Sequence, residues 1–433
     1  MRDFATSSDP AVQAQLDRLG ALSLPQGRFG LETIRELCAR LGDPQDRLPP
    51  VFHVAGTNGK GSTCAYLRSI LEAQGYTVHA ATKPHLVRYN ERIRIAGKLI
   101  DDAELAALLS EVLDAAADLS PSFFEVTTAA TFLAFTRHPA DACVIETGLG
   151  GRFDATNVIP SPTVCGIASL GIDHEAFLLA PEEGVPTNPL ARIAFEKAGI
   201  AKPGVPLVTQ AYSTDVTRTI IDHANLVGAK ATIRDHDWSA RIGATIAYRD
   251  AAGSLDLPLP ELAGAHQADN AALAVAMLRH QDVVTVSPGA IAQGIRSARW
   301  PARLQLLGPG PLTALVPGRR VWLDGGHNAD AGEAIARFFA AEGPPGLHLI
   351  VGMLAAKNPE AILAPLRRQV ASLTVVPVAG HDSHSASTFG PAARPAPDVA
   401  SALHMIEAPG DVLIAGSLYL AGSVLAANDE APD

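Results

Sequence analysis

Short apolar runs alternate with helical segments along most of the chain. This alternation constrains the fold most strongly, because two parallel strands need a long crossover connection, which is usually a helix. The runs predict strands at 51–55, 77–81, 142–146, 164–169, 321–323, 347–351, 373–376 and 412–415. The sequence therefore predicts an α/β protein with parallel sheets.

The length predicts two domains, because 433 residues exceed what one hydrophobic core usually serves. A Gly- and Pro-rich stretch with weak periodicity ends near residue 310, and the strand–helix alternation restarts beyond it. We predict an N-terminal domain over 1–303, a linker over 304–312 and a smaller open-sheet C-terminal domain over 313–433.

Composition excludes several classes of function. A net charge of −11 argues against nucleic acid as a partner. The longest uncharged apolar stretch, 412–427, falls short of the roughly 20 residues of a membrane span, and we interpret it as a buried strand, a turn and a helix. The four cysteines are widely spaced without a CxxC pair, which favours a reducing, cytoplasmic setting over a disulfide framework or a zinc site.

The segment AGTNGKGS, residues 55–62, lies between a predicted strand and a predicted helix, and we call it the phosphate loop. Glycines let backbone N–H groups turn toward a phosphate, and a helix N-terminus adds partial positive charge. Lys60 can reach terminal phosphates, and Ser62 or Thr63 can offer a hydroxyl to Mg²⁺. The spacing departs from GxxxxGK[ST] because Gly61 follows Lys60. The alternative is an ordinary glycine turn, which the flanking strand and helix disfavour.

Polar residues also follow two other predicted strands. Glu146 ends an apolar run, where an ionised carboxylate needs a partner, either Mg²⁺ or a lysine. Asp173 and His174 follow the strand at 164–169. Because the carboxyl ends of parallel strands meet at one edge of a sheet, these residues are candidates for one ligand site.

Motifs spread over nearly the whole chain resemble the folylpolyglutamate synthase/dihydrofolate synthase branch of the Mur-ligase superfamily. They run in that family's order, and PHLVRYNERI and GLGGRFDATN are more specific than the phosphate loop. The matching segments are AGTNGKGS (55–62), PHLVRYNERIRI (84–95), FFE (123–125), ETGLGGRFDATN (146–157), IDH (172–174), EKAGI (196–200), HQADNAALA (266–274), PARLQ (301–305), DGGHN (324–328) and GML (352–354).

The resemblance implies a P-loop ATPase domain followed by a smaller Rossmann-like domain, and an enzyme of folate biosynthesis and one-carbon metabolism. ATP would phosphorylate a substrate carboxylate, and the amine of L-glutamate would attack the acyl phosphate. The acceptor would be dihydropteroate, a reduced folate, or both. The implied cofactors are ATP with one or two Mg²⁺ ions, and we expect a monomer.

The resemblance also implies roles for particular residues. Lys60, His174 and Lys197 would act in the reaction, and Lys197 matches a lysine that becomes carbamoylated in the family. Ser62, Glu146 and His174 match metal ligands. Nucleotide-binding positions are matched by Gly56, Thr57, Asn58, Gly59, Lys60, Gly61, Ser62, Asn270, Arg303, Asp324 and His327. Substrate-binding positions are matched by Gln26, Gly27, Arg28, Phe29, Ser122, Phe123, Phe124, Glu125, Phe153, Asp154, Ala155 and Ser417.

The chain departs from the family pattern at three places, of which DGGHN (324–328) in place of D-x-A-H-N is a mild change. Lys83 stands where the family has a small hydroxyl residue, and a lysine ammonium cannot ligate Mg²⁺. Either Lys83 turns to solvent, or it takes over part of a metal's role. The segment between His174 and Lys197 is longer than usual and rich in Pro and Glu. Two alternatives therefore stay open: another Mur-type amide ligase, or a degenerate, non-catalytic nucleotide-binding protein.

Overall fold

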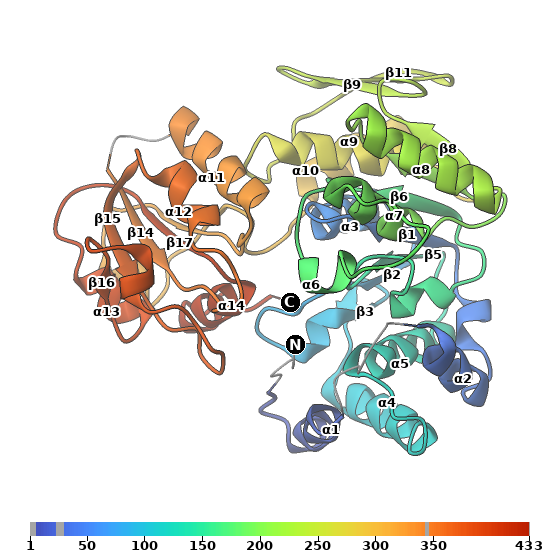
Figure 1. The fold of residues 1–433 in the computed structure, drawn as a ribbon, viewed down its shortest axis with the longest axis horizontal. Helices are drawn as coiled ribbons and strands as arrows, with labels where there is room; N and C mark the ends of the chain where they lie inside the picture. Colours follow the sequence, from blue (N-terminus) through green and yellow to red (C-terminus); the bar gives the residue numbers. More distant parts are fainter. Residues whose placement is uncertain (1–5, 23–29, 343–345, 433) are drawn as a thin grey trace. The chain divides into compact units, whose positions relative to one another are not determined.

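The computed structural model describes residues 6–22, 30–342 and 346–432, which divide into two compact units (Figure 1). The first unit holds Met1–Lys83, Tyr89–Glu261 and Ala268–Ala298. The second holds Pro84–Arg88, Leu262–Gln267 and Arg299–Asp433. Residues 304–312, where we predicted a linker, lie within the second unit.

The first unit is built on a sheet that has eight strands within the described residues, in the order β4-β3-β2-β5-β1-β6-β7-β8. From β2 to β8 neighbouring strands are parallel, and β3 and β4 add an antiparallel edge. The strands are β1 (Val51–Ala55), β2 (Val78–Ala81), β3 (Ile93–Ile95), β4 (Lys98–Leu99), β5 (Ala142–Glu146), β6 (Val164–Ile167), β7 (Pro206–Thr209) and β8 (Lys230–Ile233).

Helices cover both faces of this sheet, which explains why its central strands are apolar without alternation. On one face, Val51, Cys143 and Ile145 join a core made with α1, α2, α4 and α5, which Figure 1 draws together on one side. Gly166 faces the other side, where an added Cβ would lie 2.3 Å from Met277 Sδ of α9. The helices are α1 (Pro10–Gly20), α2 (Glu32–Arg40), α3 (Lys60–Ala73), α4 (Asp102–Ala115), α5 (Phe123–Arg137), α6 (Glu175–Leu178), α7 (Pro189–Ala198), α8 (Thr214–Val227), α9 (His266–Arg279) and α10 (Pro288–Ser297), with 3-10 turns η1 (Pro44–Arg47), η2 (Tyr89–Arg92) and η3 (Ala155–Val158).

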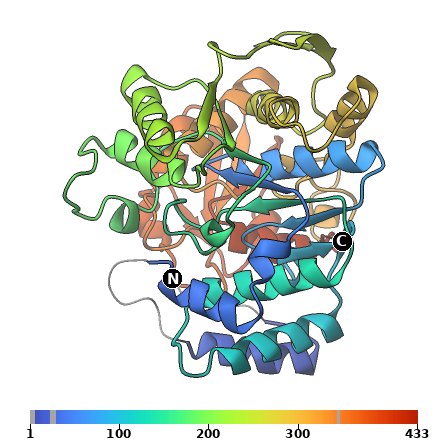
Figure 2. The same ribbon diagram turned by 90° about the vertical axis from the view of Figure 1, so that its right-hand side faces the viewer.

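A small antiparallel sheet completes the first unit. It consists of β9 (Ser239–Ile242), β10 (Ile246–Asp250) and β11 (Gly253–Leu257). In both views it lies at the end of the unit opposite α1 and α4 (Figures 1 and 2). Tyr248 of β10 and Trp238, the residue before β9, are buried, and their rings stack with centroids 5.8 Å apart.

The second unit is also of the α/β class. Across the described part of the chain its sheet has the strand order β12-β13-β17-β14-β15-β16. All neighbours are parallel except β12, which runs antiparallel to β13. Its elements are β12 (Gln305–Leu306), η4 (Thr313–Leu315), β13 (Val321–Leu323), α11 (Ala329–Glu342), β14 (Leu347–Val351), α12 (Glu360–Leu366), β15 (Val370–Val375), η5 (Ala386–Phe389), β16 (Arg394–Pro395), α13 (Val399–His404), β17 (Val412–Ala415) and α14 (Leu418–Ala427). The α/β fold class predicted from the sequence is confirmed.

Three further expectations can be compared with the structure. The apolar stretch 412–427 is β17 followed by α14, as predicted. None of the helices in the described ranges combines the length and apolarity needed to cross a bilayer. All four cysteines are buried and none forms a disulfide.

Candidate functional site

The phosphate loop connects the buried strand β1 to the start of α3. Gly59 has a φ of +79°, a left-handed conformation that favours glycine. The amides of Thr57 and Asn58 already donate to Ser169 O, at 2.8 and 3.2 Å. The first bond within the helix joins Thr63 N to Gly59 O, so the amides of residues 60–62 at the helix start are the ones able to bind an anion.

Asn270 of α9 lies directly against this loop. A Cβ on Gly59 would come within 2.4 Å of Asn270 Oδ1. The side chain of Asn270 is 4% exposed, so the amide group is held in place by its surroundings. The fold thus brings together two predicted nucleotide-binding segments that are far apart in the sequence.

Glu146 is a buried carboxylate near the loop's lysine. It ends β5 and is 3% exposed, and its Oε1 lies 4.0 Å from Lys60 Nζ. Its Oε2 accepts a hydrogen bond of 3.1 Å from the backbone N–H of Lys83. Lys60 Nζ also donates to Thr57 O at 3.3 Å. One of the two partners that the sequence allowed for Glu146, a lysine, therefore lies near it.

Lys197 lies beneath the phosphate loop. Its Nζ donates to Gly56 O at 2.9 Å, and the residue is 4% exposed. Burial, and next the positive charge of Lys60, lower the pKa of Lys197 to about 7, although Asp173 and other carboxylates oppose the shift. A large fraction of this amine is therefore neutral and nucleophilic at neutral pH.

Lys83 points toward the loop that follows β5. A Cβ on Gly148 would lie 3.4 Å from Lys83 Cδ and 3.8 Å from its Nζ. Asp154 Oδ2 accepts hydrogen bonds of 2.8 Å from the amides of Gly148 and Leu149. Burial raises the pKa of Asp154, but the charge of Lys83 and hydrogen bonds from Thr156 and the amide of Leu149 outweigh it and hold the pKa below its usual value. Burial lowers the pKa of Lys83, and the charges of Asp154 and Glu146 oppose that shift, so Lys83 and Asp154 interact electrostatically.

The predicted metal ligands do not form a protein-only metal centre. His174 has a φ of +54° at the start of α6, and its Nε2 lies 4.0 Å from Asp173 Oδ2. In the described ranges, no group of three or more His, Cys, Asp or Glu side chains could hold a metal ion. The buried hydroxyl of Thr63 has no hydrogen-bond partner there. Glu146 and a hydroxyl of α3 thus fit a hard cation that takes its other ligands from phosphate and water.

A cavity of about 530 Å³ opens beside the loop that contains Asp154. This volume is typical of a site for a small organic ligand. Five segments line it: the start of α2, the start of α5, the loop after β5, α6 with the residues after it, and α7. Predicted substrate-binding residues that line the cavity are Ser122, Phe124, Glu125, Phe153, Asp154 and Ala155.

The polar members of this set are already engaged. Ser122 and Glu125 form a capping box at the start of α5, in which Glu125 Oε2 accepts from Ser122 N at 2.7 Å. Phe123 packs edge-on against Tyr89, whereas Phe124 is 38% exposed. Phe124 is therefore the member of this segment with apolar surface available to a ligand. Gln26, Gly27, Arg28 and Phe29 lie outside the described residues.

The predicted site residues of the second unit lie near strand ends: Asp324 and His327 follow β13, Arg303 precedes β12, and Ser417 follows β17. Asp324 accepts from Leu304 N at 2.8 Å and from Gly326 N at 2.6 Å. Arg303 Nη1 lies 3.2 Å from the position of a Cβ on Gly325, and His327 Nδ1 lies 3.0 Å from Gly325 O. Ser417 caps α14 by accepting from Tyr419 N. Their binding roles stay predictions.

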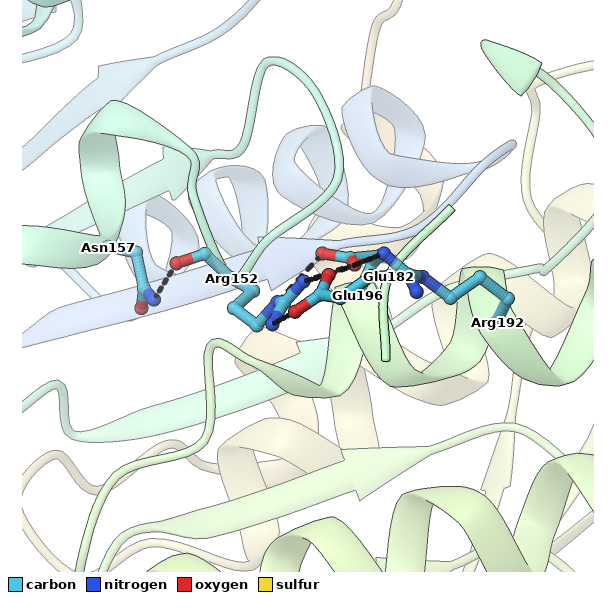
Figure 3. A network of polar contacts seen from close by, with 5 residues as sticks. All are labelled: Arg152, Asn157, Glu182, Arg192 and Glu196. Atoms are coloured by element: carbon cyan, nitrogen blue, oxygen red, sulfur yellow. Dashed lines mark hydrogen bonds and ion pairs between the residues drawn. The ribbon is translucent and has the colours of Figure 1, made fainter. Parts of the chain in front are cut away.

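An ion-pair network that the sequence did not predict lies at the cavity and consists of Arg152, Glu182, Arg192 and Glu196 (Figure 3). All four residues line the cavity. Arg152 and Glu196 each belong to a matched motif. In the sequence, however, Glu196 looks like part of an ordinary helix end, and Glu182 lies in the segment between His174 and Lys197 that is rich in Pro and Glu. The sequence shows two arginines and two glutamates in these segments, but it does not show which of them pair.

No family model matches this chain. A dihydrofolate synthase/folylpolyglutamate synthase from Bacillus subtilis is 36% identical over 323 residues, which is 71% of each chain. Escherichia coli FolC, solved in complex with DHPP and ADP, superimposes with a TM-score of 0.84 at 33% identity over 98% of each chain. A bifunctional folylpolyglutamate synthase/dihydrofolate synthase, solved with Mn, AMPPNP and L-glutamate, has a TM-score of 0.84 at 30% identity over 99% of each chain.

Proposed function

This chain belongs to the folylpolyglutamate synthase/dihydrofolate synthase family, and we propose that it joins L-glutamate both to dihydropteroate and to reduced folates. It is an ATP-dependent ligase that forms a carbon–nitrogen bond. The dual acceptor range is supported by relatives named for both activities. It is also supported by a cavity of suitable volume lined by aromatic side chains.

One observation carries the proposal: a single loop joins the phosphate side of the site to the acceptor cavity. Glu146 at the start of this loop lies 4.0 Å from Lys60 Nζ, and Phe153, further along, lines the cavity. A ligase of this kind must bring the acceptor carboxylate to the terminal phosphate of ATP. A loop that borders both sites provides that proximity.

We assign the nucleotide phosphates to the amides at the start of α3 and to Lys60. The ammonium of Lys60 would neutralise charge on the transferred phosphoryl group. Ser62, Glu146 and His174 are the proposed ligands of Mg²⁺, which would neutralise phosphate charge when bound. The buried carboxylate of Glu146, 4.0 Å from Lys60 Nζ at the start of α3, suits a hard cation.

We further propose that Lys197 becomes carbamoylated. Its neutral amine would attack carbon dioxide, and loss of a proton would leave a carbamate. The pKa of about 7 supports this step, because an ammonium has no lone pair with which to attack. The carbamate would carry negative charge beneath the phosphate loop. We also propose a cytoplasmic monomer, a setting that suits four cysteines without disulfides.

The test is ADP release measured with glutamate and either dihydropteroate or tetrahydrofolate. We expect release with both acceptors and none when glutamate is omitted. Lys60→Ala should lower the rate by orders of magnitude, whereas Lys98→Ala, at an exposed lysine of the same unit, should not. Release with tetrahydrofolate alone would refute the dual acceptor range. Release with neither acceptor would refute the proposed function.

A further inference from the structure

One wall of the cavity comes from α6 and the residues that follow it. Residues 176–178 and 180–182 line the cavity, together with residues at the start of α5 and Phe153. Nothing in the roles assigned above uses this wall. It belongs to the segment between His174 and Lys197.

The wall presents an aromatic side chain to the cavity. Phe177 is 45% exposed and Phe124, from the start of α5, is 38% exposed, and both line the cavity. Large apolar side chains that stay exposed inside a cavity indicate a ligand surface. A flat aromatic ring system is the kind of ligand that such side chains stack against.

The wall is attached to the rest of the site by ion pairs (Figure 3). Arg152 donates to both carboxylate oxygens of Glu182, at 3.0 and 2.5 Å. Arg192 Nη2 donates to Glu182 Oε2 at 2.8 Å. Two-point pairing between a guanidinium and a carboxylate sets their relative orientation as well as their distance. Glu182 thus fixes the wall to two separate elements.

Arg152 also packs against Phe153, which we call the floor of the cavity. The guanidinium of Arg152 lies 4.2 Å from the ring centroid of Phe153. It is also held by Glu196 of α7, with Nη2 2.7 Å from Oε1. The wall contacts the floor directly, since a Cβ on Gly150 would lie 3.0 Å from Leu178 Cδ2. Displacement of Glu182 would therefore loosen wall and floor together.

We propose that Phe177 contacts the ring system of the acceptor and that Glu182, through Arg152, is a positioning residue that holds this wall against the acceptor. The inference rests on the proposed function, because it takes the cavity to be the acceptor site. It predicts that the wall affects acceptor binding and leaves ATP binding unaffected.

The test compares Phe177→Ala, Glu182→Gln and Glu182→Asp with wild type, with Glu183→Gln as the matched control. Glu183 is adjacent in the sequence, exposed, and not part of the cavity lining. For each protein, KM for dihydropteroate, ATP and glutamate, kcat and Tm are measured. Phe177→Ala should raise KM for dihydropteroate about tenfold, the size expected for one lost aromatic contact. Glu182→Gln should raise the same KM severalfold, and Glu182→Asp should recover part of the loss.

Glu183→Gln should match wild type in every constant. The inference is overturned if Phe177→Ala leaves KM for dihydropteroate unchanged, or if Glu182→Gln alters all constants in parallel with its Tm. Since wild type still turns over in those cases, the proposed function would stand. Wild-type protein without glutamate-dependent ADP release would overturn the proposed function and this inference with it.

Discussion

Replacement of Gly59 by alanine should have two effects: it strains the backbone at residue 59, and it displaces Asn270. The left-handed conformation at φ +79° costs an alanine about 1–2 kcal/mol. The new Cβ would also stand 2.4 Å from Asn270 Oδ1, so Asn270 must move. We therefore expect Gly59→Ala to lose both stability and nucleotide affinity.

Gly204→Ala is the matched control. Gly204 lies in the same unit with a φ of +74°, and no atom would lie within 4 Å of its new Cβ. It carries the same conformational cost without any displacement of a neighbour. Both variants should therefore lose about 1–2 kcal/mol of unfolding free energy from the backbone. The additional loss of nucleotide affinity should occur in Gly59→Ala alone.

The expected loss of nucleotide affinity follows from the proposed contact between Asn270 and the charged nucleotide. A hydrogen bond to a charged group contributes about 1.5–3 kcal/mol, so its loss raises Kd roughly 10- to 150-fold. The unfolding free energy is measured by urea unfolding without nucleotide, because bound nucleotide would add stability. The Kd is measured by calorimetric titration with AMPPNP. An unchanged Kd in Gly59→Ala, or an equal rise in Kd in both variants, would refute the placement of Asn270 at the nucleotide.

Three other substitutions test the charged groups around the loop. Glu146→Gln keeps the shape of the side chain and removes its charge, so the Mg²⁺ concentration for half-maximal rate should rise about tenfold or more, while Tm changes little; a superimposable Mg²⁺ titration would make Glu146 a structural residue. Lys197 becomes protonated as the pH falls through about 7, and the protonated amine cannot form a carbamate. Activation by bicarbonate should therefore disappear below that pH. In Lys197→Met it should be absent at every pH. Lys83→Ser removes the ammonium beside Asp154 and adds a hydroxyl, so the Mg²⁺ requirement or bound Mg²⁺ should increase; if neither changes, Lys83 does not take a metal's role.

Local sequence was sufficient for the elements that carry the site. The strand, glycine loop and helix around residues 51–73 are decided by short-range patterns: a continuous apolar run, glycines, and then a helical segment. Glu146 was recognised because an acidic residue at the end of an apolar strand needs a partner. The family resemblance rested on such segments, and the comparisons confirm it.

The same local pattern can carry two meanings that sequence does not separate. Ser122 and Glu125 matched substrate positions, but their spacing is also that of a capping box, which is where their polar atoms are engaged. The motif at 84–95 reads as one unit, yet Pro84–Arg88 is assigned to the second unit and Tyr89 onward to the first. Leu86 and Val87 pack on the core of the second unit, a partnership with residues far away in the chain.

By itself the sequence determined the fold class, the phosphate loop, the strand-end carboxylate and the family, because each depends on residues close together in the chain. Only the tertiary structure decided which distant charges pair. Arg152 meets Glu182 and Glu196 across 30 and 44 residues, and charge alone does not select those partners from the chain's 45 acidic residues. Their pairing depends on how α7 and the loop after β5 pack, since an ion pair forms only where the fold brings its two charges into contact.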